Sequence, residues 1–322
     1  MREINIQKNE DNQRLDRFLK KYLDEASLGF IYKMLRKKNI KLNGKKAQPE
    51  DIIIEGDTIQ LYLAEETIEK FIGKKKEPKS KIIPNIVYED KNIILINKPI
   101  GVLSHGTGAE FEENIVDSMI SYLIEKGDYV PRIEKTFTPS ICNRLDRNTS
   151  GIVIGAKNYS ALKIINESIR RQNINRFYKA IVKGEVNKDF KGESYLTKDE
   201  TRNKVRVSNK QVDGSKKIIT KGRVIKTSSL YSLLEIELIT GRTHQIRAYL
   251  SSLGHPLIGD RKYGDPKVNN HFKNKYDLEN QWLHAYKIDL QGLEEDFEYL
   301  NEKSFVAEMK DKFKDIEEDL FS

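Results

Sequence analysis

Three charged side chains lie close together just before the apolar run 152–154: Arg144, Asp146 and Arg147. A carboxylate flanked by two guanidinium groups is expected to remain ionised, because neighbouring positive charge favours its charged form. The Thr-Ser-Gly segment 149–151 can fix a tight loop through side-chain and backbone hydrogen bonds. An ionised carboxylate at the junction of a loop and a strand can act as a nucleophile or a base. A purely structural Asp–Arg pair fits the segment equally well.

A second polar segment, residues 240–247, reads Thr-Gly-Arg-Thr-His-Gln-Ile-Arg, and 254–261 reads Gly-His-Pro-Leu-Ile-Gly-Asp-Arg. Threonine and glycine before a helical pattern expose backbone N–H groups that suit a phosphate or a turn. Because Arg242 and Arg247 are five residues apart, an ideal helix would not place them on one face. One of them could therefore bind phosphate while the other points inward. The alternative is a polar helix start with arginines on the surface.

The composition is that of a globular protein. With 322 residues the chain can form two domains, and 38% hydrophobic against 33% charged residues argues against disorder. No apolar stretch is long enough to span a membrane, and the first residues lack the apolar core of a secretory signal. Cys142 is the only cysteine, so no intramolecular disulfide can form, which fits a cytoplasmic protein.

The charge is distributed unevenly. The chain carries a net charge of +8, but residues 291–322 carry −7, so the first 290 residues carry +15. Such a basic body favours a polyanionic partner such as nucleic acid. A lysine-rich surface that serves only solubility is the alternative.

Apolar spacing predicts two helices near the N-terminus, over residues 12–23 and 27–37, with Ser27 as the N-cap of the second. Asn43-Gly44 after alternating Ile40 and Leu42 predicts a hairpin, and Gly56-Asp57 predicts a turn before a further strand. We therefore expect a small α/β domain over residues 1–70. The basic stretch 71–83 contains Gly and Pro without apolar periodicity, which is typical of a linker.

Residues 84–322 are expected to form the second domain. Their pattern predicts strands at 93–96, 151–156, 178–182 and 230–239, and helices at 115–126, 161–171 and 243–253. Strands and helices alternate too irregularly for a doubly wound parallel sheet, so the fold class is α+β. We assign the acidic C-terminal segment to this domain as well, because five of its residues could share an apolar face: Phe305, Val306, Met309, Phe313 and Ile316.

Several motifs of this second domain, taken together and in this order, resemble the RluA family of pseudouridine synthases. They are Asn97-Lys98-Pro99 with Gly101, residues 144–151, Tyr178-Lys179-Ala180 with Val182 and Gly184, residues 240–264, and Leu283-His284-Ala285. The resemblance spans nearly the whole second domain and implies a mixed, largely antiparallel sheet with flanking helices. The sequence looks closest to the RluC-like branch. Asn143 departs from the family, which often has histidine there, and this bears on the subfamily rather than on activity.

The resemblance implies a role for individual residues. Asp146 matches the catalytic aspartate of the family, and Arg247 matches the arginine that pairs with it. Tyr178 matches the active-site tyrosine that stacks on the target uracil and can handle a proton. Arg144 matches an arginine that enters the RNA stack where the uridine leaves. Arg242 is a further candidate for RNA binding.

The implied reaction suits these residue types. Converting uridine to pseudouridine detaches the base, turns it and rejoins it through carbon, which needs no redox change, metal or other cofactor. A carboxylate can attack the anomeric carbon, or stabilise or deprotonate the sugar, and the sequence leaves the route open. Removing the uridine from its stack costs a few kcal/mol. Stacking on an aromatic ring, worth roughly 1–3 kcal/mol per base, would offset part of this cost.

The first domain resembles the S-four-type RNA-binding domain, named after a small-subunit ribosomal protein. The marks are Arg14-Leu15-Asp16 with Phe18-Leu19, residues 36–40, Asn43-Gly44 and Gly56-Asp57. Between residues 27 and 49 there is no acidic residue, and the candidates for binding the RNA backbone are Lys33, Arg36, Lys37, Lys38, Lys41, Lys45 and Lys46. A solvated basic helix face is the alternative reading.

The expected function is pseudouridine synthesis in structured RNA, with 23S ribosomal RNA favoured as the substrate. Neither a membrane nor a small-molecule cofactor is expected as a partner. Two alternatives stay open: a synthase of the same family that acts on transfer RNA, and a non-catalytic RNA-binding or ribosome-assembly factor on this fold. The five histidines have no metal-ligand spacing, and neither common phosphate-binding glycine loop occurs.

Overall fold

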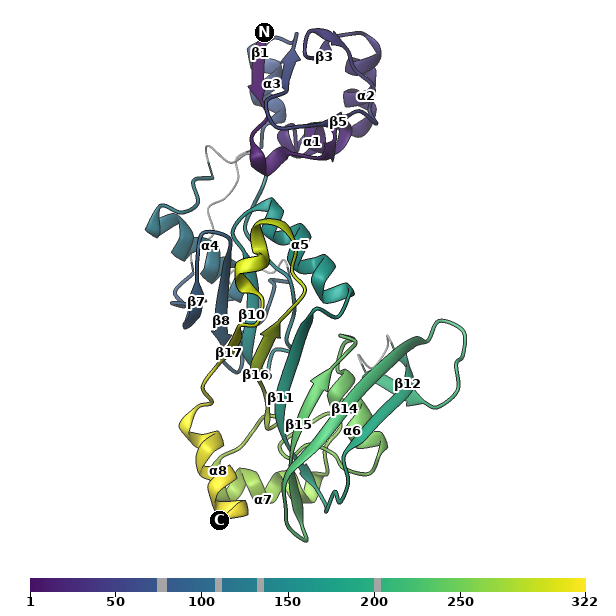
Figure 1. Cartoon of the computed structure of the whole chain (residues 1–322), viewed down its shortest axis with the longest axis vertical. Coiled ribbons are helices and arrows are strands. Elements are labelled where there is room, and N and C mark those ends of the chain that lie inside the picture. Colours follow the sequence, from purple (N-terminus) through teal and green to yellow (C-terminus); the bar gives the residue numbers. More distant parts are fainter. Residues whose placement is uncertain (74–79, 108–111, 132–135, 200–203) are drawn as a thin grey trace.

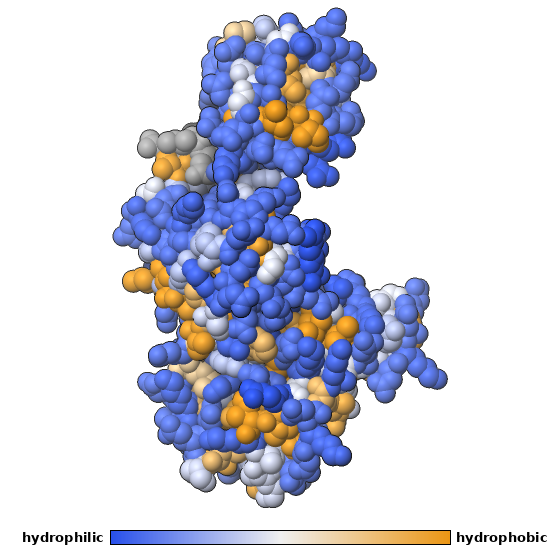
Figure 2. Space-filling view, in the orientation of Figure 1, coloured by the Kyte–Doolittle hydropathy of each residue, from blue (hydrophilic) through white to orange (hydrophobic). Residues whose placement is uncertain are grey.

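The computed structural model describes residues 1–73, 80–107, 112–131, 136–199 and 204–322. Two groups of elements follow one another along the chain, each with a sheet and a buried apolar cluster of its own (Figure 1). In Figure 2 the visible face of both groups is mostly hydrophilic, with smaller hydrophobic areas. Within the described ranges, no helix has the length and apolar character needed to cross a membrane.

The first group, here called the N-terminal module, covers residues 1–72. Its four-stranded sheet has the order β1-β6-β3-β4, and β2 pairs separately with β5. The strands are β1 (Arg2–Asn5), β2 (Gln13–Arg14), β3 (Ile40–Leu42), β4 (Lys45–Lys46), β5 (Ile52–Ile53) and β6 (Thr58–Leu61). The helices are η1 (Lys8–Glu10), α1 (Leu15–Tyr22), α2 (Leu28–Arg36) and α3 (Glu65–Phe71).

Local sequence signals explain several boundaries of the module. The Ser27 hydroxyl accepts a hydrogen bond from Phe30 N at 3.2 Å, which caps α2 as expected. Asn43 and Gly44 both have positive φ, 50° and 74°, as a two-residue hairpin turn requires. Helix α1 begins three residues later than predicted, because residues 13–14 pair with β5 instead.

The N-terminal module contacts the rest of the chain. Lys8 Nζ donates to Asp296 Oδ2 at 2.8 Å, and the Lys21 ammonium lies over the ring of Tyr159 at 5.2 Å. Of the predicted linker, residues 74–79 lie outside the described residues, and α3 extends to Phe71. At the other end of that stretch the backbone N–H of Lys81 donates to Glu113 at 3.1 Å.

The second group, residues 84–322, is built on an 11-stranded sheet with the order β13-β12-β14-β15-β11-β16-β10-β8-β7; β17 pairs with β16, and β9 pairs with β10. All pairs are antiparallel except β10 with β16. The expected α+β class with a largely antiparallel sheet is confirmed. The strands are β7 (Ile86–Glu89), β8 (Ile93–Lys98), β9 (Ser140–Ile141), β10 (Ser150–Ala156), β11 (Ile174–Lys183), β12 (Phe190–Asp199), β13 (Lys204–Ser208), β14 (Lys216–Thr227), β15 (Tyr231–Leu238), β16 (Leu283–Leu290) and β17 (Ser304–Val306).

Helices cover both faces of this sheet because β8 and β10 are apolar on both sides. Ile94, Ile96 and Val153 pack with α4 (Ile115–Lys126) and α6 (Gln245–Ser252). The alternate residues Ile93 and Ile154 pack on the other face with α5 (Tyr159–Arg170) and η2 (Glu295–Leu300).

The acidic C-terminal segment is packed against the fold. Helices α7 (Pro266–Tyr276) and α8 (Asp311–Phe321) enclose the buried Trp282, whose ring stacks on Phe313 at a centroid distance of 4.9 Å. Phe313 and Ile316 are buried as expected, whereas Val306 is 56% exposed. Val306 does not belong to the shared apolar face, because it lies on the short strand β17 rather than on α8.

Candidate active site

Asp146 lies in the loop that leads into β10, and hydrogen bonds fix its backbone on both sides. The Ser104 hydroxyl accepts from Leu145 N at 3.0 Å and donates to Leu145 O at 2.8 Å. On the other side, Asp146 O accepts from Thr149 N at 3.0 Å. The Asp146 side chain keeps 23% of its surface exposed, so its position is defined while its carboxylate remains accessible.

A glycine allows this loop to enter the sheet. Gly151 has a φ of 117°, and a Cβ on it would lie 2.2 Å from the carbonyl oxygen of Ala285 on β16. No L-residue with a side chain fits such an approach without moving the strands. The close parallel pairing of β10 with β16 therefore depends on this residue type and fixes where the Asp146 loop ends.

Lys98, at the end of β8, anchors the same loop through hydrogen bonds of its side chain. Its side chain is fully buried, and its ammonium donates to Pro99 O at 2.9 Å, Val102 O at 2.8 Å and Arg147 O at 3.0 Å. Burial lowers the pKa of this ammonium to about 7, and the charge of Asp146 opposes the shift. The three carbonyl acceptors tie the turn after β8 to the residue that follows Asp146.

Replacing Lys98 by methionine is expected to lower the free energy of unfolding by about 2–3 kcal/mol, because three partly buried carbonyls lose their donor. Turnover should fall as well, since Asp146 is no longer held in place. Urea unfolding and single-turnover assays would measure the two effects. The matched control is Lys91→Met at an exposed position of the preceding turn. Equal stability of the two variants would contradict the anchoring role.

Arg247 joins two carboxylates. Its Nε and Nη2 donate to Asp260 at 2.7 and 2.8 Å, and its Nη1 donates to Asp146 Oδ2 at 2.8 Å. Asp260 is fully buried and also accepts from the backbone N–H groups of Lys262 and Tyr263. Although burial acts in the opposite direction, Arg247 holds the pKa of Asp260 below its usual value. Asp260 thus fixes the guanidinium, and the guanidinium in turn orients Asp146.

Gln245 positions the start of α6, the helix that carries Arg247. Its side chain is buried; Oε1 accepts from Arg242 N at 3.1 Å and from the Thr240 hydroxyl at 2.9 Å. Its Nε2 donates to Ile219 O at 3.1 Å, which ties the helix start to β14. Arg242 lies before the helix and is exposed, whereas Arg247 is buried. One arginine thus points inward and the other outward, which is one of the two arrangements that the sequence left open.

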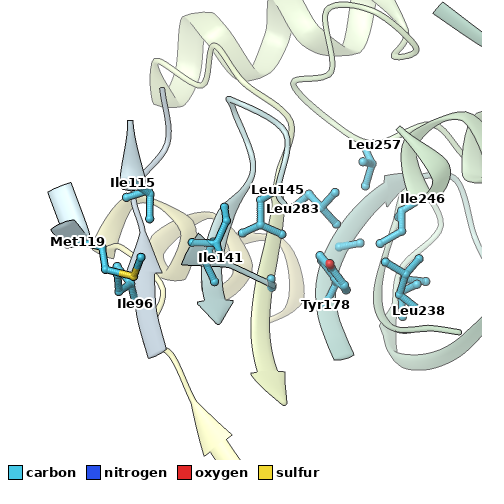
Figure 3. Packing of buried hydrophobic residues seen from close by; sticks show 14 of the residues in the cluster. Ile96, Ile115, Met119, Ile141, Leu145, Tyr178, Leu238, Ile246, Leu257 and Leu283 are labelled. Atoms are coloured by element: carbon cyan, nitrogen blue, oxygen red, sulfur yellow. The ribbon is translucent and has the colours of Figure 1, made fainter. Parts of the chain in front are cut away.

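Tyr178 lies on β11 and is only 5% exposed. Figure 3 shows it among Leu145, Leu283, Ile246 and Leu238, an apolar surround that suits an aromatic ring or a base. Burial raises the pKa of its hydroxyl; the nearby Arg176 opposes this shift and Asp146 adds to it. The hydroxyl is therefore neutral at physiological pH.

One cleft of about 1070 Å³ brings these groups together. Among its lining residues, Asp146 and Glu279 are the acids. The cations that line it are Arg144, Arg147, Arg170, Arg176, Lys198, Arg242, Arg247, Arg261 and Lys262. This excess of positive charge fits a polyanion that carries an uncharged base into the apolar end of the cleft.

The predicted site residues fall into two places. Asp146, Tyr178, Arg247, Arg144 and Arg242 all line the cleft, and Arg144 is exposed at its rim. The seven basic residues between positions 33 and 46 lie on the N-terminal module instead. Six of these are exposed, and Lys41 is partly covered, with its ammonium 4.9 Å from the centre of the Tyr62 ring.

Sequence reasoning gave no role to Asp260, Lys98 or Arg176. Asp260 and Lys98 stood in the quoted motifs, but no periodicity relates either of them to Asp146. Arg176 is buried two residues before Tyr178 on the same strand, and its Nε has no hydrogen-bond partner among the described residues. The one available signal was the spacing of Arg176 and Tyr178, because residues two apart on a strand point to the same face of the sheet.

Comparison with known proteins identifies relatives over nearly the whole chain. Residues 92–252 match the family model described as RNA pseudouridylate synthase. An uncharacterized RNA pseudouridine synthase of Mycoplasma capricolum is 31% identical over 94% of this chain and 95% of its own length. Ribosomal large subunit pseudouridine synthase C of Escherichia coli is 29% identical over 88% of this chain and 86% of its own length. Among solved structures, human RNA Pseudouridylate Synthase Domain Containing 4 shares the fold, with a TM-score of 0.55 and 24% identity over 71% of this chain and 90% of that one.

Proposed function

The chain belongs to the RluA family of RNA pseudouridine synthases, and we propose that it acts in the cytoplasm on 23S ribosomal RNA. The observation that carries the choice of substrate is the length of the similarity to synthases named for the large ribosomal subunit. It includes at least part of the N-terminal module, since 88% of this chain aligns with the Escherichia coli relative and the remaining 12% is shorter than residues 1–72. A substrate that engages both regions must be large and structured.

The test is to map pseudouridines in ribosomal and transfer RNA from cells that lack the protein. We expect one or a few positions of 23S ribosomal RNA to revert to uridine and to be restored by the wild-type gene. Loss confined to transfer RNA would instead support a synthase for that substrate. An unchanged map would favour the non-catalytic assembly factor.

For the chemistry we propose that Asp146 acts at the anomeric carbon of the flipped uridine. Its accessible carboxylate and its hydrogen bond to Arg247 support this role, because the guanidinium fixes the orientation of the carboxylate. As the glycosidic bond breaks, Asp146 either bonds to the sugar or takes a proton from it. The base then turns and bonds to the anomeric carbon through C5. This step displaces Asp146 from the sugar, or the sugar regains the proton that Asp146 took, so the carboxylate is regenerated. The base loses its C5 proton and gains one on N1, and the reaction remains an isomerisation.

We further propose that Tyr178 stacks on the flipped uracil and that Arg144 occupies the vacated place in the RNA. The apolar surround of Tyr178 and the exposed position of Arg144 support these roles. Arg242, exposed at the same cleft, is assigned to a backbone phosphate.

Substitutions of Tyr178 should separate its ring from its hydroxyl. Tyr178→Leu loses the stacking surface and should weaken RNA binding about tenfold as well as turnover. Tyr178→Phe keeps the ring, so binding should persist while single turnover slows by about 10²-fold or more if the hydroxyl handles a proton. Tyr231→Phe, a half-buried tyrosine outside the cleft, is the control. Full activity in the leucine variant would remove Tyr178 from the site.

We propose that residues 1–70 form an S-four-type RNA-binding domain, joined by residues 71–83 to a catalytic domain over 84–322. The separate sheet and apolar cluster of the module support this division. The exposed basic residues of α2, of the two positions that follow it and of β4 would then bind the RNA backbone: Lys33, Arg36, Lys37, Lys38, Lys45 and Lys46, with Lys41 of β3 beside them. They would raise the local concentration of the target without entering the reaction.

The triple substitution of Lys37, Lys38 and Lys45 by glutamine should weaken binding to structured ribosomal RNA. Each lost phosphate contact removes about 0.7–0.9 from the slope of log affinity against log salt, so the slope should decrease by about 2–3. Binding titrations at several salt concentrations measure it. The control removes equal charge elsewhere, at the exposed Lys267, Lys310 and Lys314. If both triple variants change the slope equally, the module has no special part in RNA binding.

A further inference from the structure

His244 lies beside Asp146 and has no part in the chemistry proposed above. It is the N-cap of α6 and has a φ of 54°, in the left-handed region that residues with a side chain rarely adopt. Its side chain is 12% exposed and lines the cleft. Strained backbone of this kind persists where the surrounding structure holds a side chain in a required place.

A chain of hydrogen bonds fixes which nitrogen of His244 carries the proton. Val205 N, on the edge strand β13, donates to the Tyr263 hydroxyl oxygen at 2.9 Å. That oxygen is also 3.0 Å from His244 Nδ1. Among the described residues the Tyr263 hydroxyl has no other acceptor, so its proton points to Nδ1 and the imidazole hydrogen lies on Nε2. Burial lowers the pKa of His244 despite the opposing charge of Asp146, which favours this neutral ring.

The remaining nitrogen faces the carboxylate across a gap. His244 Nε2 lies 3.9 Å from Asp146 Oδ2, too far for a direct hydrogen bond. A single oxygen atom about 2.8 Å from each would bridge the two. Because Nε2–H only donates and the carboxylate only accepts, the bridging group must accept from one and donate to the other.

We propose that the ribose 2′-hydroxyl of the target uridine fills this gap, accepting from His244 Nε2–H and donating to Asp146 Oδ2. This inference rests on the proposed function. Within an RNA chain the 3′ and 5′ oxygens are esterified, the ring oxygen and the uracil carbonyls only accept, and N3–H only donates. The 2′-hydroxyl is thus the one group of the nucleotide that can do both.

The position of this hydroxyl fits the chemistry of the site. Its carbon is bonded to the anomeric carbon, so a carboxylate that acts at the anomeric carbon lies within reach of the 2′ oxygen. His244 then places the sugar against Asp146 and makes the site select ribose over deoxyribose. Tyr263 acts through His244 and is a positioning residue.

A cycle of enzyme and substrate variants tests the contact. The substrates are two short RNAs that contain the mapped uridine, one entirely ribose and one with a single 2′-deoxyuridine at the target. For the wild type we expect the deoxy substitution to lower single-turnover kcat/KM by about 100-fold. His244→Ala should be about tenfold slower on the ribose RNA and lose only about tenfold more on the deoxy RNA. Intrinsic effects of the missing oxygen on the reaction are common to both enzymes and cancel in the comparison.

Two further variants refine the cycle. His244→Gln can place an amide N–H near the former Nε2 and should recover part of the discrimination. Tyr263→Phe frees the imidazole to take either tautomer and should reduce discrimination while RNA affinity is retained. Equal deoxy penalties in the wild type and His244→Ala would overturn the inference and leave the proposed function intact. Absence of product from the wild type on the ribose RNA would instead count against the proposed substrate.

The tautomer can be measured on the free, full-length protein. Nitrogen-15 NMR of labelled histidine distinguishes the two neutral tautomers, and comparison with His244→Gln assigns the signal among the five histidines. We expect hydrogen on Nε2 in the wild type and a mixture in Tyr263→Phe. Hydrogen on Nδ1 in the wild type would overturn the donor role without any reference to the substrate.

Discussion

Asp146→Asn is expected to slow pseudouridine formation by about 10⁴-fold or more and to change RNA affinity by less than threefold. The amide keeps the shape of the side chain but has no negative charge with which to attack or deprotonate the sugar. Affinity depends on many phosphate contacts spread over the cleft and the N-terminal module, so one substitution changes it little. Single-turnover assays and binding titrations on the same RNA measure the two quantities.

The control for this experiment is Asp213→Asn, which makes the same change at an exposed loop position outside the cleft. It should behave as the wild type in both assays. Near-normal turnover in Asp146→Asn would remove Asp146 from the chemistry and leave the family assignment standing. A large loss of affinity in that variant would show that Asp146 mainly organises the cleft.

Arg247→Leu is expected to lower the free energy of unfolding by about 3–5 kcal/mol and to eliminate measurable turnover. The substitution leaves Asp260 fully buried without its bidentate partner, and an uncompensated buried charge has a cost of this order. Asp146 loses its orienting bond at the same time. Chemical denaturation and single-turnover assays measure the two losses separately.

The double variant Arg247→Leu with Asp260→Leu separates stability from catalysis. Replacing both charges by apolar side chains removes the unpaired carboxylate, so much of the lost stability should return. Turnover should not return, since Asp146 still lacks its guanidinium. Arg247→Lys is the complementary variant: it keeps the charge but cannot make the same three planar hydrogen bonds, so activity should remain low. Recovery of turnover in the double variant would show that Arg247 acts only through stability.

Local patterns in the sequence determined many elements correctly. Helix α4 begins and ends where apolar spacing predicts, Ser27 caps α2, and Asn43-Gly44 forms the hairpin turn. These features depend on neighbours a few residues away, so short-range propensity is sufficient. Helix α6 was located with an error of one or two residues, because its first turn is replaced by the Gln245 bonds to the preceding loop.

Other elements were not expected from the sequence. The strands β12, β13, β14 and β16 and the helices α3, α7 and α8 were not predicted. In β12 and β14 many residues are exposed, which weakens apolar alternation as a signal. Pairing with neighbouring strands stabilises such segments, and the sequence of one strand does not reveal its partners.

The sequence by itself determined which residue types the site contains, through the motifs around Asp146, Tyr178 and Arg247. Only the tertiary structure decided how they act on one another. Asp146 and Arg247 are 101 residues apart and meet at 2.8 Å, and Lys98 reaches the same loop from 49 residues away. The hydrogen bonds that clamp Arg247 to Asp260 and set the tautomer of His244 join different strands, helices and loops. Contacts of this kind arise when the sheet brings distant segments together. The periodicity of residue types along the chain therefore does not predict them.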